Sequence, residues 1–452
     1  MLPAIDHTHD PAARSWLPAG AGPTEAVPTE AGPTEAFPVQ NLPFGVFTPA
    51  GDDVTPRIGV AIGQQVLDLA RCTSAGVCDG LPRPLAEAMC SPQLNALLAL
   101  TPAHWSALRH RLFALLVDGE DGWRAARESV RAALHPIASV HLHLPCTVGD
   151  YTDFYASIHH ATNVGTMLRP DQPLLPNYRH LPIGYHGRAS SVVVSGTPVR
   201  RPSGQNLAAG GDRPVFEPSR RLDYELEVGL VIGGANRLGE SVPIAAALDR
   251  VFGMVLLNDW SARDVQAWEY QPLGPFLAKS FATSISPWVT TLESLASCRV
   301  AAAARGPDGP ALLPYLEDAD DQAAGAFDVT LDVTLSSRAM RDHRQSPMRV
   351  SQSNLRDLYW TPAQLVAHHA SNGCNLRPGD LLGTGTVSGP TPESRGCLLE
   401  RTWRGSEPLQ LTSGEQRRFL EDGDVVTLSA QWTSGAGGRF GACAGEVLAA
   451  RG

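Results

Sequence analysis

The sequence predicts a mainly β protein of the α+β class, with a small first domain and a larger second one. From Asn41, short apolar runs follow one another with Gly or Asp-Asp between them, which is typical of a small antiparallel β unit. After Pro145, short runs with strand periodicity outnumber helical ones. The predicted organisation is an extended segment over 1–40, a first domain over 41–145 and a second domain over 146–452.

The composition is that of an ordinary globular protein. The chain has 452 residues, 43% of them hydrophobic, and a formal net charge of -10 at pH 7. This acidic balance, with no basic cluster, argues against a nucleic-acid partner. The start MLPAIDHTHD lacks the features of a signal peptide, and no apolar run reaches membrane-spanning length. We therefore expect a cytoplasmic protein without a membrane partner, whose eight scattered cysteines are free thiols.

The first domain is expected to combine strands with helices. Before it, residues 21–36 read AGPTEAVPTEAGPTEA, a near-repeat that cannot form a core and is expected to be disordered or extended. Between 41 and 70 the runs LPFGVF, RIGVAIG and QQVLDLA predict strands. Residues 82–135 have helical periodicity.

The second domain contains two clear strand patterns. In 222–232 (LDYELEVGLVI), four apolar side chains share one face, while Glu225 and Glu227 share the other. Residues 328–335 alternate in the same way, which favours a half-exposed strand. The Gly-, Pro- and Asp-rich residues 304–327 are expected to form a long surface loop.

Three further local patterns follow. Residues 361–372 predict a helix that Gly373 ends, because glycine adopts the left-handed conformation common at helix ends. RPGD at 377–380 predicts a turn into another apolar strand. Residues 381–389 (LLGTGTVSG) lack the GxGxxG spacing and predict a tight loop, in which Thr386 is available to touch a substrate oxygen.

The stretch 254–279 concentrates polar side chains. An apolar strand pattern ends at Asp259, and Ser261 and Asp264 have the spacing of a capping box at the start of a helix. Lys279 follows in a second extended piece. A solvated amphipathic helix is the alternative, but a lone carboxylate that closes an apolar strand requires a partner. On the helix a cation, an amide and a phenol share one face, those of Arg263, Gln266 and Tyr270.

Carboxylates near strand ends predict a metal site. Glu225 and Glu227 lie close enough to repel each other unless a cation lies between them. Asp259 offers a third oxygen ligand, and either Asp150 or Asp153 a fourth. All-oxygen ligands suit Ca²⁺, Mg²⁺ or Mn²⁺ better than zinc. The alternative is that the two glutamates pair with Arg or Lys on a neighbouring strand.

The segment 150–165 (DYTDFYASIHHATNVG) supplies a candidate base. His159 and His160 are adjacent and cannot face the same way, so at most one of them lies in a site. A histidine with a purely structural hydrogen bond is the alternative. The chain has no GxSxG elbow and no local signature of a cysteine nucleophile, which disfavours covalent acyl-enzyme chemistry.

Eight motifs together resemble the fumarylacetoacetase family. They are DYTDFY, HATNVG, LPIGYHGRASS, YELE, NDWSARD, PLGPFLAKSF, NGCNLRPGD and GTVSGP. The resemblance covers nearly the whole chain from about Asn41. NDWSARD alone would indicate only the wider superfamily of fumarylacetoacetase-like hydrolases. HATNVG and the long N-terminal domain narrow the resemblance to the fumarylacetoacetase family. The resemblance implies an N-terminal SH3-like barrel domain, a C-terminal mixed β-roll catalytic domain and a homodimer.

The resemblance also implies roles for individual residues. His160 is the expected base, oriented by Glu400. Lys279 and Thr283, with Asp259, are expected around a second cation, Mg²⁺. The expected Ca²⁺ ligands are Asp153, Glu225, Glu227 and Asp259. The expected electrostatic stabilisers are Arg263, Gln266 and Lys279. The expected substrate-binding residues are Tyr155, Arg169, Tyr185, Gln266, Tyr270 and Thr386.

The implied reaction is hydrolytic carbon-carbon cleavage of a small diketo acid, 4-fumarylacetoacetate. Its products are fumarate and acetoacetate, and it is the last step of tyrosine and phenylalanine degradation. One alternative is a related acylpyruvate or diketone hydrolase, or a decarboxylase, that uses the same metal ligands. The feature that distinguishes this chain from them is the pair His160 and Glu400, which those relatives generally lack. The other is a catalytically silent scaffold that metal stabilises.

Overall fold

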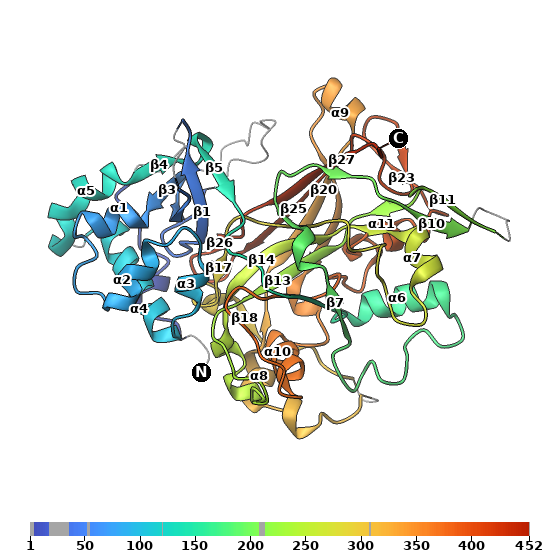
Figure 1. Cartoon of the computed structure of the whole chain (residues 1–452), viewed down its shortest axis with the longest axis horizontal. Coiled ribbons are helices and arrows are strands. Elements are labelled where there is room, and N and C mark those ends of the chain that lie inside the picture. The colour runs from blue at the N-terminus through green and yellow to red at the C-terminus, as the bar shows by residue number, and fades with distance from the viewer. Residues whose placement is uncertain are drawn as a thin grey trace.

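The computed structural model of the chain describes residues 4–17, 36–51, 55–119, 121–207, 213–306 and 309–451. The near-repeat at 21–36, predicted to be disordered or extended, lies outside these residues except for its last position. A first unit of strands and helices packs beside a larger unit that contains two extended sheets (Figure 1). The predicted mainly β, α+β class is confirmed.

The first unit is built on an antiparallel five-stranded sheet with the order β4-β3-β2-β1-β5. The three runs predicted as strands form β1 to β3, while the edge strands β4 and β5 follow the helical region. No pairing between β4 and β5 is found in the part of the chain that the structure describes. The strands are β1 (Phe44–Pro49), β2 (Arg57–Ile62), β3 (Gln65–Asp68), β4 (Leu134–Pro136) and β5 (Val140–His143).

The helical periodicity of 82–135 is confirmed. One more helix, α1, follows β3 directly, and Asp68 caps it by accepting a hydrogen bond from the backbone N–H of Arg71. The helices of the first unit are α1 (Leu69–Ser74), α2 (Arg83–Met89), α3 (Asn95–Leu98), α4 (Pro102–Leu116) and α5 (Arg127–Ala132).

The larger unit contains an eight-stranded mixed sheet with the order β7-β6-β22-β13-β14-β16-β8, and β17 pairs with β14. Its central strands β13 and β14 are antiparallel, whereas β22 runs parallel to β6 and β16 parallel to β8. The strands are β6 (Tyr151–Phe154), β7 (Gly184–Gly187), β8 (Val192–Val194), β13 (Leu226–Ile232), β14 (Val251–Asp259), β16 (Thr283–Ile285), β17 (Thr290–Thr291) and β22 (Leu381–Gly383).

A six-stranded sheet with the order β21-β20-β25-β27-β9 packs against the eight-stranded sheet, and β26 pairs with β25. Alternate residues of β20 are buried, as predicted for a half-exposed strand. The strands are β9 (Val199–Arg200), β20 (Thr330–Ser336), β21 (Met348–Asn354), β25 (Val425–Trp432), β26 (Gly438–Arg439) and β27 (Cys443–Leu448). Four strand pairs complete the unit: β10 (Ser203–Leu207) with β11 (Pro214–Pro218), β12 (Leu222–Asp223) with β15 (Ser261–Ala262), β18 (Arg299–Val300) with β19 (Ala326–Phe327), and β23 (Leu409–Gln410) with β24 (Gln416–Arg417).

One helix prediction in this unit is confirmed and one loop prediction is wrong in part. The helix over 361–372 is α10, which Thr361 caps, and Gly373 follows it with a φ of +85°. The residues 304–327 do not form one long loop, because they contain α8, which Asp318 caps. The helices are α6 (Ile158–Leu168), α7 (Arg263–Glu269), α8 (Ala319–Ala324), α9 (Arg338–Asp342), α10 (Pro362–Ala370) and α11 (Leu398–Arg401).

Short 3₁₀ helices join many of these elements. They are η1 (His7–His9), η2 (Asp121–Ala126), η3 (Ile137–Ser139), η4 (Ala189–Ser191), η5 (Ile244–Ala246), η6 (Leu248–Arg250), η7 (Ala296–Cys298), η8 (Pro314–Leu316), η9 (Leu355–Asp357) and η10 (Pro392–Ser394). In the part of the chain that the structure describes, the longest helix, α4, is far too short and polar to cross a membrane. All eight cysteines are free, as predicted.

The eight-stranded sheet is buried on both faces, and this positions the site. Along β13, Val228 and Leu230 pack in the core shared with the six-stranded sheet. Val231 packs in the core shared with the first unit. Because side chains alternate along a strand, Glu227 lies on the same face as Val231, opposite Val228, as the sequence predicts. A carboxylate on such a strand cannot reach solvent, so its partners must be supplied by the fold.

Candidate active site and metal centre

Four carboxylates meet at one end of the eight-stranded sheet. Asp153 lies on β6, Glu227 near the start of β13 and Asp259 at the end of β14, while Glu225 directly precedes β13. The register brings these positions together: β22 places Gly383 opposite Asp153. Oxygen atoms of all four side chains lie within 4.8 Å of one another, and all four side chains are buried. The sequence-predicted ligands therefore form one cluster.

The structure distinguishes the two aspartates that the sequence offered as a fourth ligand. Asp153 is buried in the cluster. Asp150 is exposed and pairs with Arg377 instead. The two aspartates differ in burial because Asp153 lies within β6, inside the sheet, whereas Asp150 directly precedes that strand.

Two buried cations pair with part of this cluster. The Nζ atom of Lys279 lies 2.5 Å from an oxygen of Glu225 and 2.5 Å from an oxygen of Asp259. The Nη1 atom of Arg263 lies 2.7 Å from the other oxygen of Glu225. The alternative of a glutamate paired with cations therefore holds for Glu225. Glu227, in contrast, has no cationic partner among the described residues.

Burial and repulsion divide the carboxylates into two electrostatic classes. Burial and the charge of Asp259 raise the pKa of Asp153 to about 8. Burial and the charges of Asp153 and Asp259 raise the pKa of Glu227 well above its ordinary value. Burial alone would also raise the pKa of Glu225, but Lys279 and Arg263 outweigh burial and hold it well below its ordinary value. Burial thus favours the protonated forms of Asp153 and Glu227, neither of which pairs with a cation among the described residues.

The cluster fits a divalent cation. With Asp223, which also pairs with Arg263, five buried carboxylates share two cations, so three negative charges are uncompensated when all five are ionised. The Oε1 atom of Glu227 is buried and has no hydrogen-bond partner among the described residues. A Cβ atom at Gly383 would lie 2.6 Å from an oxygen of Asp153 and 3.0 Å from one of Glu227, so only glycine leaves this space open. An all-oxygen set of this kind suits Ca²⁺ or Mg²⁺.

The two further predicted cation-site residues lie beside Asp259. Thr283 Oγ1 lies 3.4 Å from the second oxygen of Asp259, opposite it in the pairing of β14 with β16. Burial would lower the pKa of Lys279, but Asp259 and Glu225 raise it above its ordinary value. Since an ammonium has no free electron pair, Lys279 can coordinate a metal only through its backbone carbonyl and otherwise acts as a fixed cation.

His160, and not His159, carries the candidate base. It lies in the first turn of α6, which Ser157 caps. His160 is buried, and its Nδ1 atom lies 2.6 Å from Glu400 on α11. This contact assigns the proton to Nδ1 and leaves Nε2 as the basic nitrogen. Burial would raise the pKa of Glu400, but His160 outweighs burial and lowers it to about 2, so the carboxylate stays ionised.

Three more donors fix the orientation of Glu400. Its oxygens accept hydrogen bonds from Ser388 Oγ at 2.8 Å, from Asn163 Nδ2 at 2.8 Å and from Cys397 Sγ at 3.2 Å. A carboxylate held by this many donors cannot rotate freely, so the imidazole that it binds is also held in place.

Helix α7 presents the predicted face, although it starts differently. The capping box of Ser261 and Asp264 is wrong, because Ser261 lies in β15 and the helix begins at Arg263 without a side-chain cap. Asp264 instead accepts hydrogen bonds from the Ser219 hydroxyl and the backbone N–H of Arg220. The sequence pattern could not exclude this outcome, because the competing partners lie about 45 positions away.

Arg263 is held on both sides. Its Nε atom donates to Asp223 at 2.8 Å, and its Nη1 atom donates to Gln266 Oε1 at 3.1 Å. The second contact leaves the amide N–H groups of Gln266 as free donors. The Nη2 atom of Arg263 is buried and has no partner among the described residues. A buried guanidinium donor without a partner is suited to an oxyanion.

Asp223→Asn is expected to lower kcat by up to about 100-fold with a smaller change in KM, because the substitution loosens the guanidinium of Arg263 without removing it. Steady-state kinetics measure this split. Asp264→Asn is the matched control, since this carboxylate lies on the same helix as Arg263, α7, but accepts hydrogen bonds from residues outside the site. Equal kinetics for Asp223→Asn and the wild type would contradict a positioning role for Asp223.

A cavity of about 570 Å³ opens beside these groups. Its wall contains most of the predicted catalytic and substrate-binding residues, and three of them have buried atoms without a hydrogen-bond partner among the described residues: Arg169 Nε, Arg263 Nη2 and Thr386 Oγ1. The predicted residues in the wall are Asp153, Tyr155, His160, Arg169, Tyr185, Glu225, Arg263, Gln266, Tyr270, Lys279 and Thr386. Apart from the alternatives Asp150 and His159, the structure thus brings the predicted residues together: Glu227, Asp259 and Glu400 contact members of this wall from behind, and Thr283 contacts Asp259.

Comparison with known families accounts for nearly the whole described chain. Residues 150–448 match the model of the fumarylacetoacetate hydrolase C-terminal domain, and residues 40–145 match that of the fumarylacetoacetase N-terminal domain. The chain belongs to the fumarylacetoacetate hydrolase family. Among its relatives are proteins named fumarylacetoacetase from Arabidopsis thaliana, Homo sapiens and Caenorhabditis elegans. They are 46%, 47% and 48% identical to it, over 90%, 91% and 91% of this chain and 95%, 96% and 96% of theirs.

Solved structures of the fumarylacetoacetate hydrolase fold agree with this assignment. A fumarylacetoacetate hydrolase from Exiguobacterium antarcticum aligns with a TM-score of 0.50 at 16% identity, covering 91% of this chain and 100% of that one. A protein described as a putative HpcE protein from Mycobacterium smegmatis aligns with a TM-score of 0.50 at 21% identity, covering 90% and 99%. At these identities the likeness shows the fold alone.

Several residues around the site were not predicted from the sequence. Arg221 and Arg404 line the cavity as exposed cations. Asp223 holds Arg263, while Ser388 and Asn163 hold Glu400. Asp223 directly precedes the YELE motif, which is a weak signal for its importance. The isolated arginines carry no local signal, because their role depends only on where the cavity opens.

Proposed function

We propose that the chain catalyses the hydrolytic cleavage of 4-fumarylacetoacetate to fumarate and acetoacetate, the last step of tyrosine and phenylalanine degradation. The observation that carries this proposal is the convergence of a histidine–glutamate pair, a carboxylate cluster and unpartnered cationic donors on one cavity. Relatives named fumarylacetoacetase that are 46% to 48% identical over nine-tenths of the chain support the same reaction.

His160 acts as the general base in this proposal. Its Nδ1–H is held by ionised Glu400, so Nε2 is free to take a proton from water. The activated water attacks the carbonyl carbon next to the fumaryl half of the substrate. Glu400 stabilises the imidazolium that forms, because the carboxylate keeps its charge next to the ring. The protonated His160 then holds the proton that the departing acetoacetate carbon requires.

The oxygen of the attacked carbonyl gains negative charge, and three side chains are proposed to stabilise it. Arg263 offers its unpartnered Nη2, and Gln266 offers its amide N–H groups. Lys279 offers its third N–H donor, because the other two contact Glu225 and Asp259. Loss of one such donor typically raises the barrier by about 2.7 to 4 kcal/mol.

The resident cation is proposed to be Ca²⁺ held by Asp153, Glu225, Glu227 and Asp259. Mg²⁺ is proposed beside Asp259, Thr283 and the backbone of Lys279. A bound divalent cation supplies Lewis-acid polarisation and a fixed orientation for the two diketone oxygens. Arg263 and Lys279 keep Glu225 ionised and therefore ready for such a ligand role.

Arginines and tyrosines are proposed to bind the carboxylates of the substrate. Arg169 lies in the cavity wall with its Nε unpartnered, and Arg221 and Arg404 stand at the same cavity. Tyr155 packs edge-on against the ring of His160, with ring centroids 5.2 Å apart. Tyr185 donates a hydrogen bond to Asp259, and Tyr270 and Thr386 complete the predicted wall. A diacid suits this excess of cations better than a small monoacid does.

Finer statements about fold and assembly are part of the proposal. The first unit is proposed to be an SH3-like barrel domain over 41–145, supported by its five short antiparallel strands. Residues 146–452 are proposed as the β-roll catalytic domain. A homodimer is supported by exposed apolar side chains in the segment after α7, where Leu273 is 96% and Phe276 66% exposed. The cytoplasmic location, and the absence of nucleic-acid and membrane partners, stay predictions.

Loss of the diketone absorbance of fumarylacetoacetate by the purified protein tests the proposal. The assay is run before chelation, after it, and with Ca²⁺ or Mg²⁺ restored. Metal-dependent conversion to fumarate and acetoacetate is expected. Conversion of an acylpyruvate in preference to fumarylacetoacetate would favour the alternative hydrolase, and metal binding without turnover of either substrate would favour a silent scaffold.

A further inference from the structure

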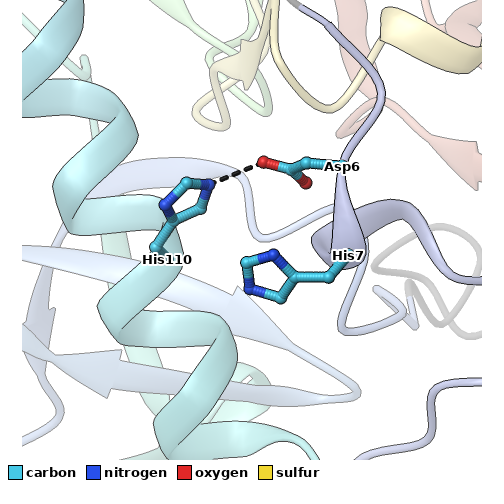
Figure 2. A group of neighbouring side chains, drawn as sticks. All are labelled: Asp6, His7 and His110. Atoms are coloured by element: carbon cyan, nitrogen blue, oxygen red, sulfur yellow. Dashed lines mark hydrogen bonds and ion pairs between the residues drawn. The ribbon is translucent and has the colours of Figure 1, made fainter.

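A second group of metal-ligating side chains lies in the first unit, where the N-terminal segment 4–17 contacts α4. Asp6 and His7 come from this segment and His110 from α4. One potential ligand atom from each of the three lies within 4.8 Å of the others. Figure 2 shows the three side chains turned toward one another. We infer that Asp6, His7 and His110 form a binding site for a divalent transition-metal ion of the zinc type.

The carboxylate of Asp6 is fixed in advance by its own segment. One oxygen accepts hydrogen bonds from the backbone N–H of Thr8 at 2.8 Å and from its hydroxyl at 2.7 Å, and lies 3.0 Å from His9 Nδ1. The other oxygen contacts only His110 Nε2, at 2.6 Å. One oxygen therefore holds the side chain in place, and the other is available as a ligand, an arrangement that metal sites use to orient their carboxylates.

His7 supplies an imidazole without a competing partner. Its side chain is exposed and makes no hydrogen bond to any described residue. Its ring centroid lies 5.1 Å from that of His110 and 5.7 Å from that of Phe113, which it meets edge-on. Contact with Phe113 thus keeps the His7 ring beside the pair formed by His110 and Asp6.

The ligand chemistry selects the class of ion. Two neutral imidazoles and one carboxylate oxygen form a mixed nitrogen and oxygen set, which suits zinc and its neighbours and leaves a fourth tetrahedral position for water. Ca²⁺ and Mg²⁺ prefer oxygen ligands throughout and belong to the carboxylate cluster of the larger unit. The two sites therefore differ in the ions that they favour.

A bound ion would tie the segment 4–17, which already contacts both units, more firmly to the first unit. Arg109 on α4 already donates to the Thr8 hydroxyl at 3.0 Å, and His9 Nε2 lies 2.7 Å from the carbonyl oxygen of Glu293 in the larger unit. The ion would add a crosslink between Asp6 and His7 on this segment and His110 on α4. Its role is structural, because none of these residues lines the cavity.

Zn²⁺ binding to the full-length protein tests the inference. The protein is first saturated with Ca²⁺ and Mg²⁺ so that the carboxylate cluster is occupied, and Zn²⁺ is then measured by equilibrium dialysis and elemental analysis. We expect the wild type to bind one equivalent more than a His7→Ala, His110→Ala double variant. His104→Ala is the matched control on α4, because its half-buried ring bonds to Thr101 and to no other described residue, and it should keep the full stoichiometry.

Hydrogen exchange supplies a second measurement. Zn²⁺ should slow amide exchange in residues 4–17 of the wild type and of His104→Ala, but not of the double variant. Equal Zn²⁺ stoichiometry in the wild type and the double variant would overturn the inference. So would unchanged exchange on Zn²⁺ addition, which would leave Asp6 and His110 as a plain hydrogen-bonded pair. Hydrolysis by the double variant should equal that of the wild type, so this test is independent of the proposed reaction.

Discussion

Replacing His160 with alanine is expected to lower kcat by about 10²- to 10⁴-fold while the metal content stays unchanged. The substitution removes the Nε2 base, the group proposed to take the proton from water. His160 is outside the carboxylate cluster, so the metal ligands keep their positions. Steady-state kinetics and elemental analysis of the same preparation measure both quantities.

His159→Ala is the matched control for this prediction. The two histidines are neighbours on α6, but only His160 is buried and contacts Glu400. The control should keep kcat near that of the wild type. Glu400→Gln should give a smaller loss than His160→Ala, because the base remains while the charge that stabilises its imidazolium is lost. Wild-type turnover by His160→Ala would contradict the assignment of His160 as the base.

Glu227→Gln is expected to abolish metal-dependent stabilisation while leaving the metal-free protein about as stable as the wild type. Burial and two neighbouring carboxylates raise the pKa of Glu227, which favours its neutral acid in the metal-free protein, and glutamine resembles that acid. At a metal concentration 100 times Kd, binding stabilises the wild type by about 2.7 kcal/mol. The variant should lose most of this gain in thermal unfolding with and without Ca²⁺.

Two other variants separate the metal interpretation from the ion-pair interpretation. Glu225→Gln should destabilise even the metal-free protein, by about 3 kcal/mol, because it leaves Arg263 and Lys279 buried with less negative charge. Asp150→Asn is the control, since this carboxylate is exposed and outside the cluster. A Glu227→Gln protein that keeps wild-type metal affinity would show that the cluster is held by its ion pairs alone.

Several local features followed from the sequence because neighbouring residues decide them. The helix predicted over 361–372 forms as α10, and the structure shows that its capping box joins Thr361 and Gln364, only three positions apart. The alternation along β20 records directly which side chains face the core. The surplus of carboxylates near strand ends required compensation in any fold, so a cation site was predictable before its geometry was known.

Other outcomes depended on partners that are remote in the sequence. Asp264 fits a capping box on local spacing, yet Ser219 and Arg220 occupy its carboxylate. Lys279 lies in a turn between α7 and β16 and not in the extended piece that the sequence predicts. Its pairing with Glu225 likewise appears only when segments 54 positions apart lie side by side.

The sequence by itself determined the residue types of the site, its oxygen-rich chemistry and the strand and helix that carry its central members. Only the tertiary structure decided that Asp153 rather than Asp150, and His160 rather than His159, belong to it. The physical reason is that burial and charge act through space. Glu400 is 240 positions from His160, and Asp153 joins its cluster through a strand that is more than 200 positions away.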